Sequence, residues 1–117
     1  MQIPFIDLKS QYEAYKEEIN KEVLDVLSST QFIMGPQVSK LEESLAHYTG
    51  AKYAFACSSG TDALLLALMA IDIQPDDEII TTPFTFIATA ETIALLKAKP
   101  VFVDIDETTY NIDPSLI

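Results

Sequence analysis

The chain has 117 residues, and its seven basic residues, all lysines, face 18 acidic ones, which gives a formal net charge of -11 at pH 7. A hydrophobic share of 49% with 21% charged residues is typical of a globular protein and not of a disordered one. An acidic chain without a basic cluster argues against nucleic acid and anionic membranes as partners, and no apolar stretch is long enough to cross a bilayer. The single cysteine, Cys57, excludes an internal disulfide and a cysteine-based zinc site. With no secretory signal at its start, the chain is predicted to be a soluble cytoplasmic protein without a membrane segment.

Residues 1–50 are expected to form an N-terminal helical segment. From Leu8 to Ser28 apolar residues recur at helical spacing, and Asp7 stands where an N-cap is needed. A second helix is predicted to start at Gly35-Pro36, because proline suits the first helical turn, and to end at Gly50.

Residues 51–117 change to an alternation of strands and helices. Strands are predicted at 53–57, 78–82 and 100–105, and helices at 61–71 and 87–97. The first of these helices is rich in alanine and leucine, which indicates a buried helix. Strands separated by helices of about a dozen residues are typical of parallel neighbours with right-handed crossovers. The predicted fold class is therefore α/β, with two helices followed by β-α-β-α-β.

The end of the chain predicts a continuation. Asp113-Pro114-Ser115 has the pattern of a helix start, yet only two residues follow it. Three parallel strands would also leave an open edge and uncovered apolar faces. We therefore expect the chain to be the front portion of a longer protein.

A candidate anion site follows the first predicted strand, at Ser59-Gly60-Thr61. Glycine lets a ligand approach the backbone, the two hydroxyls can donate, and the following helix offers free N–H groups at its start. This combination suits a phosphate group, although neither a dinucleotide fingerprint nor a Walker loop is present. A capped turn without any ligand is the alternative interpretation.

A candidate aromatic surface follows the second predicted strand, at Phe84 and Phe86. Aromatic residues two apart in an extended segment point to the same side, so either could stack on a flat ligand. Packing beneath a loop is the alternative. A cofactor with a phosphate and a planar ring could bridge the two strand ends, where ligands bind in open α/β sheets.

Two aspartates, Asp104 and Asp106, end the last predicted strand and could suggest a metal or an acid–base pair. No third ligand is near them in sequence, so a structural or solvated role is expected and no metal site is predicted.

An ordered set of short motifs resembles the start of the nucleotide-sugar aminotransferases of the DegT/StrS group. The motifs are Phe5-Ile6-Asp7-Leu8, Gly35-Pro36, Gly50-Ala51-Lys52-Tyr53, Ser59-Gly60-Thr61-Asp62-Ala63-Leu64, Thr85-Phe86-Ile87-Ala88-Thr89 and Val103-Asp104-Ile105-Asp106. This resemblance implies the N-terminal part of the large domain of an aspartate-aminotransferase-type (fold type I) enzyme, with residues 51–117 starting the domain that binds pyridoxal phosphate. It also implies a homodimer that moves an amino group from an amino acid, usually glutamate, to a keto-sugar linked to UDP or dTDP.

The resemblance also implies roles for particular residues. Gly60 and Thr61 match the positions that hold the cofactor phosphate, with Ser59 beside them, and Phe86 matches the aromatic residue that stacks on the pyridine ring. The Schiff-base lysine and the carboxylate that keeps the pyridine nitrogen protonated are expected beyond Ile117. No catalytic residue is therefore assigned within the chain, which is predicted to be inactive alone.

Three functions remain open from the sequence. The first is transamination, with UDP-linked 3-keto sugars of surface-polysaccharide synthesis as the substrates that Thr61-Asp62-Ala63-Leu64 resembles most. The second is sugar dehydration on the same fold, which follows when the lysine is replaced. The third is a non-catalytic α/β binding module that is complete at this length.

Overall fold

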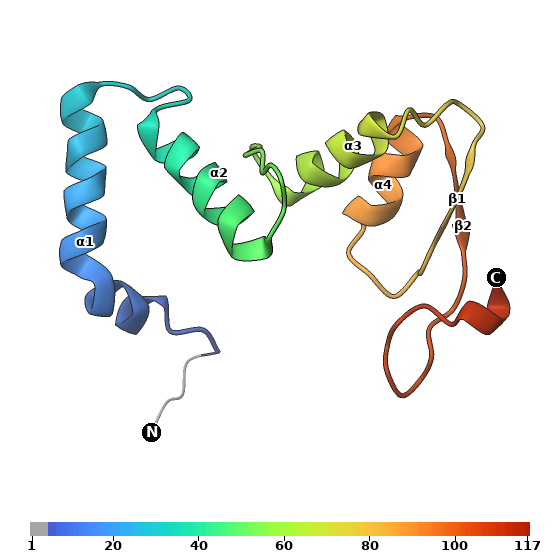
Figure 1. The fold of residues 1–117 in the computed structure, drawn as a ribbon. Coiled ribbons are helices and arrows are strands. Elements are labelled where there is room, and N and C mark those ends of the chain that lie inside the picture. The colour runs from blue at the N-terminus through green and yellow to red at the C-terminus, as the bar shows by residue number, and fades with distance from the viewer. Residues whose placement is uncertain (1–4) are drawn as a thin grey trace. The chain divides into compact units, whose positions relative to one another are not determined.

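The computed structural model describes residues 5–117; the first four residues, on which the prediction about a secretory signal partly depends, lie outside the described part. The chain divides into two compact units, Met1–Ala56 and Cys57–Ile117, and each is described by itself. Figure 1 labels the helices and strands along the chain.

The first unit begins with helix α1, Leu8–Ser29, as the apolar spacing predicts. Asp7 caps it as expected: its Oδ1 accepts the backbone N–H of Ser10 at 3.0 Å and its Oδ2 accepts the Ser10 hydroxyl at 2.6 Å. No helix within residues 5–117 combines the length and the apolar character needed to cross a membrane.

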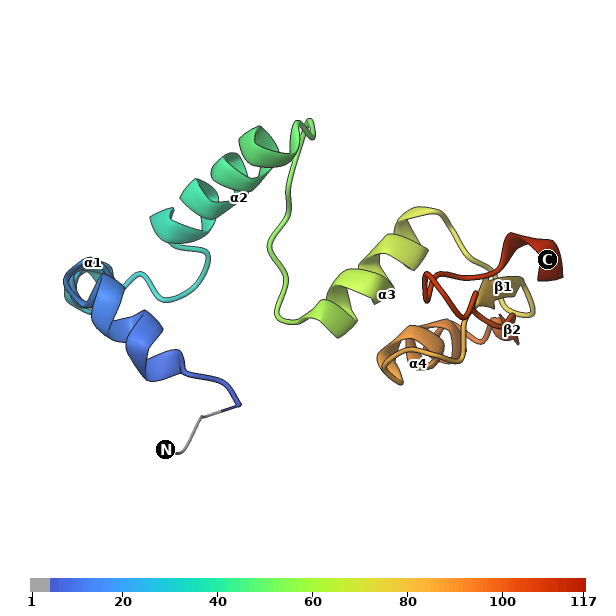
Figure 2. The ribbon, with the colours of Figure 1, turned by 90° about the horizontal axis from the view of Figure 1, so that it is seen from below.

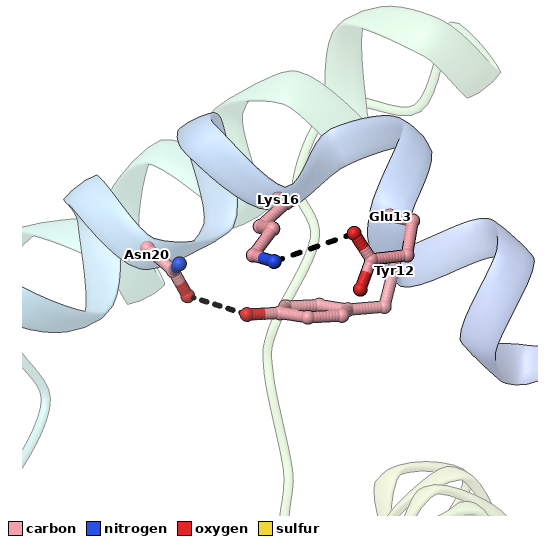
Figure 3. Close-up of polar contacts among 4 residues, drawn as sticks. All are labelled: Tyr12, Glu13, Lys16 and Asn20. Atoms are coloured by element: carbon pink, nitrogen blue, oxygen red, sulfur yellow. Dashed lines mark hydrogen bonds and ion pairs between the residues drawn. The ribbon is translucent and has the colours of Figure 1, made fainter.

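A kink at Tyr15, where φ is -117° and ψ is 15°, interrupts α1 near its start. Two polar contacts span it (Figure 3): the Tyr12 hydroxyl donates to Asn20 Oδ1 at 3.0 Å, and Lys16 Nζ pairs with Glu13 at 3.3 Å. The Lys16 ammonium also lies 5.8 Å from the centre of the Tyr12 ring. The Tyr12–Asn20 bond spans eight residues and therefore ties the short first part of the helix to the longer second part.

Helix α2, Pro36–Thr49, starts and ends at the predicted glycines. Gly50 closes it with a left-handed φ of 71°, the conformation that favours glycine after a helix. Beyond it, residues 51–56 run back along the helix, because Glu42 Oε1 accepts the N–H of Ala56 at 2.8 Å.

The second unit contains the sheet and two of the helices. Its elements are α3 Gly60–Ala70, β1 Glu78–Thr81, α4 Ala88–Leu95, β2 Lys99–Phe102 and a 3-10 turn Pro114–Leu116. Strands β1 and β2 are parallel neighbours, with a register that runs from Glu78 opposite Lys99 to Thr81 opposite Phe102. Helix α4 packs on this pair and on α3, and the buried residues of this unit come from this region: Ala88, Thr92, Ile93, Ala98 and Val103.

The prediction of a strand at residues 53–57 is wrong. The segment is not assigned as a strand, and the sheet of the described residues consists of β1 and β2 alone. A strand needs a ladder of paired N–H and C=O groups, and the N–H of Ala56 is taken by a carboxylate instead. The observed order is therefore two helices, then α-β-α-β.

The prediction that the helix after this segment is buried is also wrong. No residue of α3 is buried, and Leu66 is 51% exposed. Among the described elements α3 packs against α4 alone, so one helix face is covered and the others are open.

The Asp7 cap predicts a pH dependence at the start of α1. Hydrogen bonds from the Ser10 hydroxyl and then from the Ser10 N–H hold the pKa of Asp7 below its usual value. Because the folded pKa is lowered, the cap stabilises the helix above the ordinary carboxyl pKa of about 4 and is lost as the pH falls through the lower folded value. The protection factor of the Ser10 amide, the ratio of its intrinsic exchange rate to its observed rate at the same pH, should therefore fall in acid, and Asp7→Asn should remove most of this pH dependence. An unchanged protection factor at Ser10 across this range would contradict the cap.

Replacing Gly35 with a larger residue is predicted to disturb the packing of the turn before α2. A Cβ built there would lie 2.5 Å from the backbone oxygen of Gln31, so the turn must shift to accept it. Gly35→Ala should lower the free energy of unfolding in urea by about 1–3 kcal/mol, the usual cost of overpacking. Gly50→Asn is the control, because nothing lies within 4 Å of a Cβ there and asparagine tolerates a positive φ. A larger loss in the control than in Gly35→Ala would contradict this reasoning.

Candidate functional site

The turn at the start of α3 has two backbone donors without partners. Ser59 is extended and caps the helix, since its Oγ accepts the N–H of Asp62 at 3.1 Å and its carbonyl accepts the N–H of Ala63 at 3.0 Å. The N–H groups of Gly60 and Thr61 have no hydrogen bond to any group in the described part of the chain. Two free donors at the positive end of an 11-residue helix suit an anion.

Gly60 keeps this turn open. A Cβ built at Gly60 would have no atom within 4 Å, and the backbone there does not need a left-handed φ. The glycine is therefore not required by the turn itself, and its open face is available to a ligand that approaches the backbone.

The carboxylate of Asp62, which is near this turn, is hydrogen-bonded within the turn. The Ser58 hydroxyl donates to the Asp62 carboxylate, so this negative group already has a donor. Cys57 is exposed, and its thiol lies 3.3 Å from the Ser59 carbonyl oxygen. The pattern of serines around Gly60 could have indicated these contacts, because Ser and Asp spaced three or four residues apart often form caps.

The two phenylalanines after β1 differ in their surroundings. Phe84 stacks on Tyr110, with ring centres 5.8 Å apart and an angle of 29° between the planes, whereas Phe86 is 76% exposed and has no aromatic partner among residues 5–117. The expectation that both lie in one extended segment is wrong, because the segment turns: the N–H of Thr85 bonds the carbonyl of Pro83 at 3.0 Å. The Phe84 ring therefore contacts another ring of the protein, whereas the Phe86 ring has no aromatic partner within the described residues and is available to a ligand.

Both candidate segments lead into helices that pack together. Helices α3 and α4 run side by side, with their first turns at the same end (Figures 1 and 2). Ser59 precedes the first turn of α3, and Phe86 lies two residues before the first turn of α4. An apolar hollow of about 230 Å³ between these helices and β1 is lined by Leu64, Ile80, Thr89, Ile93 and their neighbours, and it offers no charged group.

The carboxylates of the two aspartates after β2, Asp104 and Asp106, accept hydrogen bonds from backbone N–H groups. Asp104 Oδ1 accepts the N–H of Ile105 at 2.8 Å, and Asp106 Oδ1 accepts the N–H groups of Thr109 at 2.7 Å and Thr108 at 3.1 Å. Hydrogen bonds from Thr109, and then from Thr108, hold the pKa of Asp106 below its usual value. Tyr110, which follows Thr109, was not predicted as a functional residue, although an aspartate followed by threonines two and three residues later is a turn pattern.

The second unit thus combines two unpartnered N–H groups at the start of α3 with an exposed aromatic ring before α4, an arrangement that suits a ligand with an anionic group and a flat ring. The chain belongs to the DegT/DnrJ/EryC1/StrS aminotransferase family, whose model matches residues 13–117. This confirms the family that the sequence motifs resemble.

Three similar proteins show which kinds of enzyme resemble the chain. The chain is 53% identical over 115 residues, 98% of its length, to the UDP-2-acetamido-2-deoxy-3-oxo-D-glucuronate aminotransferase of Pseudomonas aeruginosa, of which it covers 32%. The crystal structure of NtdA from Bacillus subtilis with bound PMP matches 99% of the chain and 27% of NtdA, at a TM-score of 0.91 and 32% identity. The GDP-4-keto-6-deoxy-D-mannose-3-dehydratase of E. coli with bound hydrated PLP matches 80% of the chain and 26% of the enzyme, at a TM-score of 0.76 and 35% identity. The chain therefore spans about a quarter to a third of the length of these relatives, and the two solved structures among them have the fold type I architecture.

The Ser59 cap predicts a measurable stability loss. Ser59→Ala should lower the free energy of unfolding by about 1 kcal/mol, because the N–H of Asp62 loses its acceptor. Ser59→Asp keeps an acceptor and is the control, with a smaller expected loss. Urea unfolding without added ligand measures both, and equal losses in the two variants would contradict the capping role.

Proposed function

We propose that this chain forms the cofactor-binding start of a pyridoxal-phosphate-dependent aminotransferase that acts on a UDP- or dTDP-linked keto-sugar. The observation that carries the proposal is the pair of unpartnered N–H groups at Gly60 and Thr61, in a chain of a sugar aminotransferase family. The Pseudomonas relative, named for a UDP-linked 3-oxo sugar, favours a UDP-linked 3-keto sugar as the substrate. Glutamate as the amino donor follows from the family resemblance.

The described residues fit pyridoxal phosphate, the cofactor that the bound PMP and PLP of the relatives support. The two free N–H groups, with the hydroxyl of Thr61, supply donors for the phosphate, and the open face of Gly60 lets it approach the backbone. The free ring of Phe86 is available to stack on the pyridine ring. Ser59 supports this arrangement through its cap.

Within such a site each residue has a limited task. When bound, the cofactor supplies an electron-accepting ring for amino-group transfer. Gly60 and Thr61 would hold the negative phosphate through charge-assisted hydrogen bonds, and the N-terminus of α3 favours negative charge there. The bond from Ser58 to Asp62 keeps that carboxylate engaged within the turn.

The lysine that links to the cofactor is proposed to lie beyond Ile117, so the chain alone should be inactive. Two lysines of the chain are already paired with acids, Lys16 with Glu13 at 3.3 Å and Lys99 with Asp76 at 2.8 Å, and Lys52 lies over the Tyr53 ring. We retain as predictions the division at residue 50, the homodimer and the cytoplasmic location.

Dehydration is the second candidate function, favoured by the match to the E. coli dehydratase. The same phosphate turn would serve both reactions, because both bind the cofactor. The presence or absence of the linking lysine in the full-length protein distinguishes the two candidates.

The proposed activity has a direct test. Full-length protein with pyridoxal phosphate, glutamate and a UDP-linked 3-keto sugar should form the amino sugar and 2-oxoglutarate, and a 4-keto sugar should react more slowly. Product analysis by mass spectrometry measures both. Folded protein that shows no cofactor absorbance and no amino sugar would refute transamination, and a deoxygenated keto-sugar product would establish dehydration.

Thr61→Val should weaken cofactor binding with little effect on folding. A lost hydrogen bond to a charged group is worth about 1.5–3 kcal/mol, which corresponds to a rise of about 12–140-fold in Kd for pyridoxal phosphate. Titration of the apoprotein measures this change. Thr61→Ser keeps the hydroxyl and is the control, and equal affinities in the two variants would exclude the hydroxyl as a phosphate ligand.

A further inference from the structure

The segment after β2 forms a closed hairpin-like turn. Ile105 and Ile112 pair as an antiparallel bridge, and the N–H of Asp106 donates to the carbonyl of Asn111 at 2.9 Å. Inside the turn, the N–H of Tyr110 donates to the carbonyl of Asp106 at 2.9 Å. The Asp106 carboxylate also accepts two backbone N–H groups, so this turn is held at several points.

Tyr110 has a backbone conformation that a bulky residue rarely adopts. Its φ is 59°, in the left-handed region that glycine and asparagine favour. Such strain persists only where surrounding bonds impose it, as the bonds to Asp106 do here. The bonds to Asp106 therefore fix the backbone that carries the Tyr110 ring.

The Tyr110 ring makes a contact between the segments that follow the two strands of the sheet. The Tyr110 ring stacks on Phe84, with centres 5.8 Å apart and planes at 29°. Phe84 lies in the segment after β1, and β1 and β2 are parallel neighbours, so both segments leave the sheet at the same edge. The stack therefore joins these segments through side chains.

The stack between Phe84 and Tyr110 also restricts the segment that carries the exposed ring of Phe86. Phe86 lies two residues after Phe84, in a segment that is also held by the N–H of Phe84 on Thr82 Oγ1 at 3.1 Å and by the Thr85 and Thr89 hydroxyls at 3.1 Å. With Phe84 held by Tyr110, the backbone that carries Phe86 has less freedom, and a ring already positioned loses less entropy when a ligand binds.

We propose that Tyr110 is a positioning residue: by stacking on Phe84 it fixes the segment that presents Phe86 to the pyridine ring of the cofactor. This inference rests on the proposed function, since it assumes that Phe86 contacts pyridoxal phosphate. Tyr110 itself does not touch the cofactor in this proposal.

The test compares variants of the full-length protein that separate the ring from the backbone. Tyr110→Asn removes the ring and suits the positive φ, so the turn should persist, whereas Tyr110→Phe keeps the ring. Phe84→Leu removes the stack from the other side and provides the test should Tyr110→Asn not fold. Tyr48→Asn is the matched control, because Tyr48 is 88% exposed, on α2.

Two measurements are made on each variant: the Kd of the apoprotein for pyridoxal phosphate and the circular dichroism of the bound cofactor. Tyr110→Asn and Phe84→Leu should each raise the Kd about 2–12-fold, the worth of an aromatic pair, and alter the cofactor dichroism. The double variant should lose no more than either single one, because both remove the same contact. Tyr110→Phe and Tyr48→Asn should match the wild type.

Wild-type affinity and dichroism in Tyr110→Asn and Phe84→Leu, together with a weakened Phe86→Leu variant, would overturn the role of Tyr110 and leave the proposed function standing. A wild-type protein that binds no pyridoxal phosphate would instead overturn the proposed function, and this inference with it.

Discussion

The hydrogen bond from the N–H of Asp62 to Ser59 Oγ determines which donors at the start of α3 remain available. A helix start has four N–H groups without partners inside the helix. Here the cap and the Ser59 carbonyl take the N–H groups of Asp62 and Ala63, and those of Gly60 and Thr61 are left. The proposed phosphate site consists of these two remaining groups, so the same local bonds stabilise the helix and define the site.

The second unit supplies a rigid base for this turn and for the aromatic segment after β1. Helix α4 has a buried face, in which the Thr92 hydroxyl is satisfied by the carbonyl of Ala88 at 2.9 Å, and it packs on both the sheet and α3. The segments after β1 and β2 are held instead by their own local hydrogen bonds and by the stack between Phe84 and Tyr110. Phe84 is engaged in this contact within the protein, while Phe86 has no aromatic partner among the described residues.

Much apolar surface in the described chain has no partner. The hollow between the end of α1 and Phe32 has a volume of about 360 Å³ and includes Val23, Val26 and Leu27. Large apolar side chains at this exposure are unusual on a monomer surface. The chain covers 32% of its Pseudomonas relative, and we expect the rest of the full-length protein to cover the exposed faces of α1 and α3.

The sequence by itself determined the helices α1, α2, α3 and α4, their caps at Asp7 and Gly50, and the two strands of the sheet, because these depend on local periodicity and on residues next to each other in the chain. It also determined the family, through short motifs in a fixed order. Only the tertiary structure decided that residues 53–57 remain unpaired, that α3 is exposed, and that Phe84 contacts the protein while Phe86 is free. These outcomes depend on which distant groups come together, such as Ala56 with Glu42 and Phe84 with Tyr110, and neither spacing nor composition encodes such pairs.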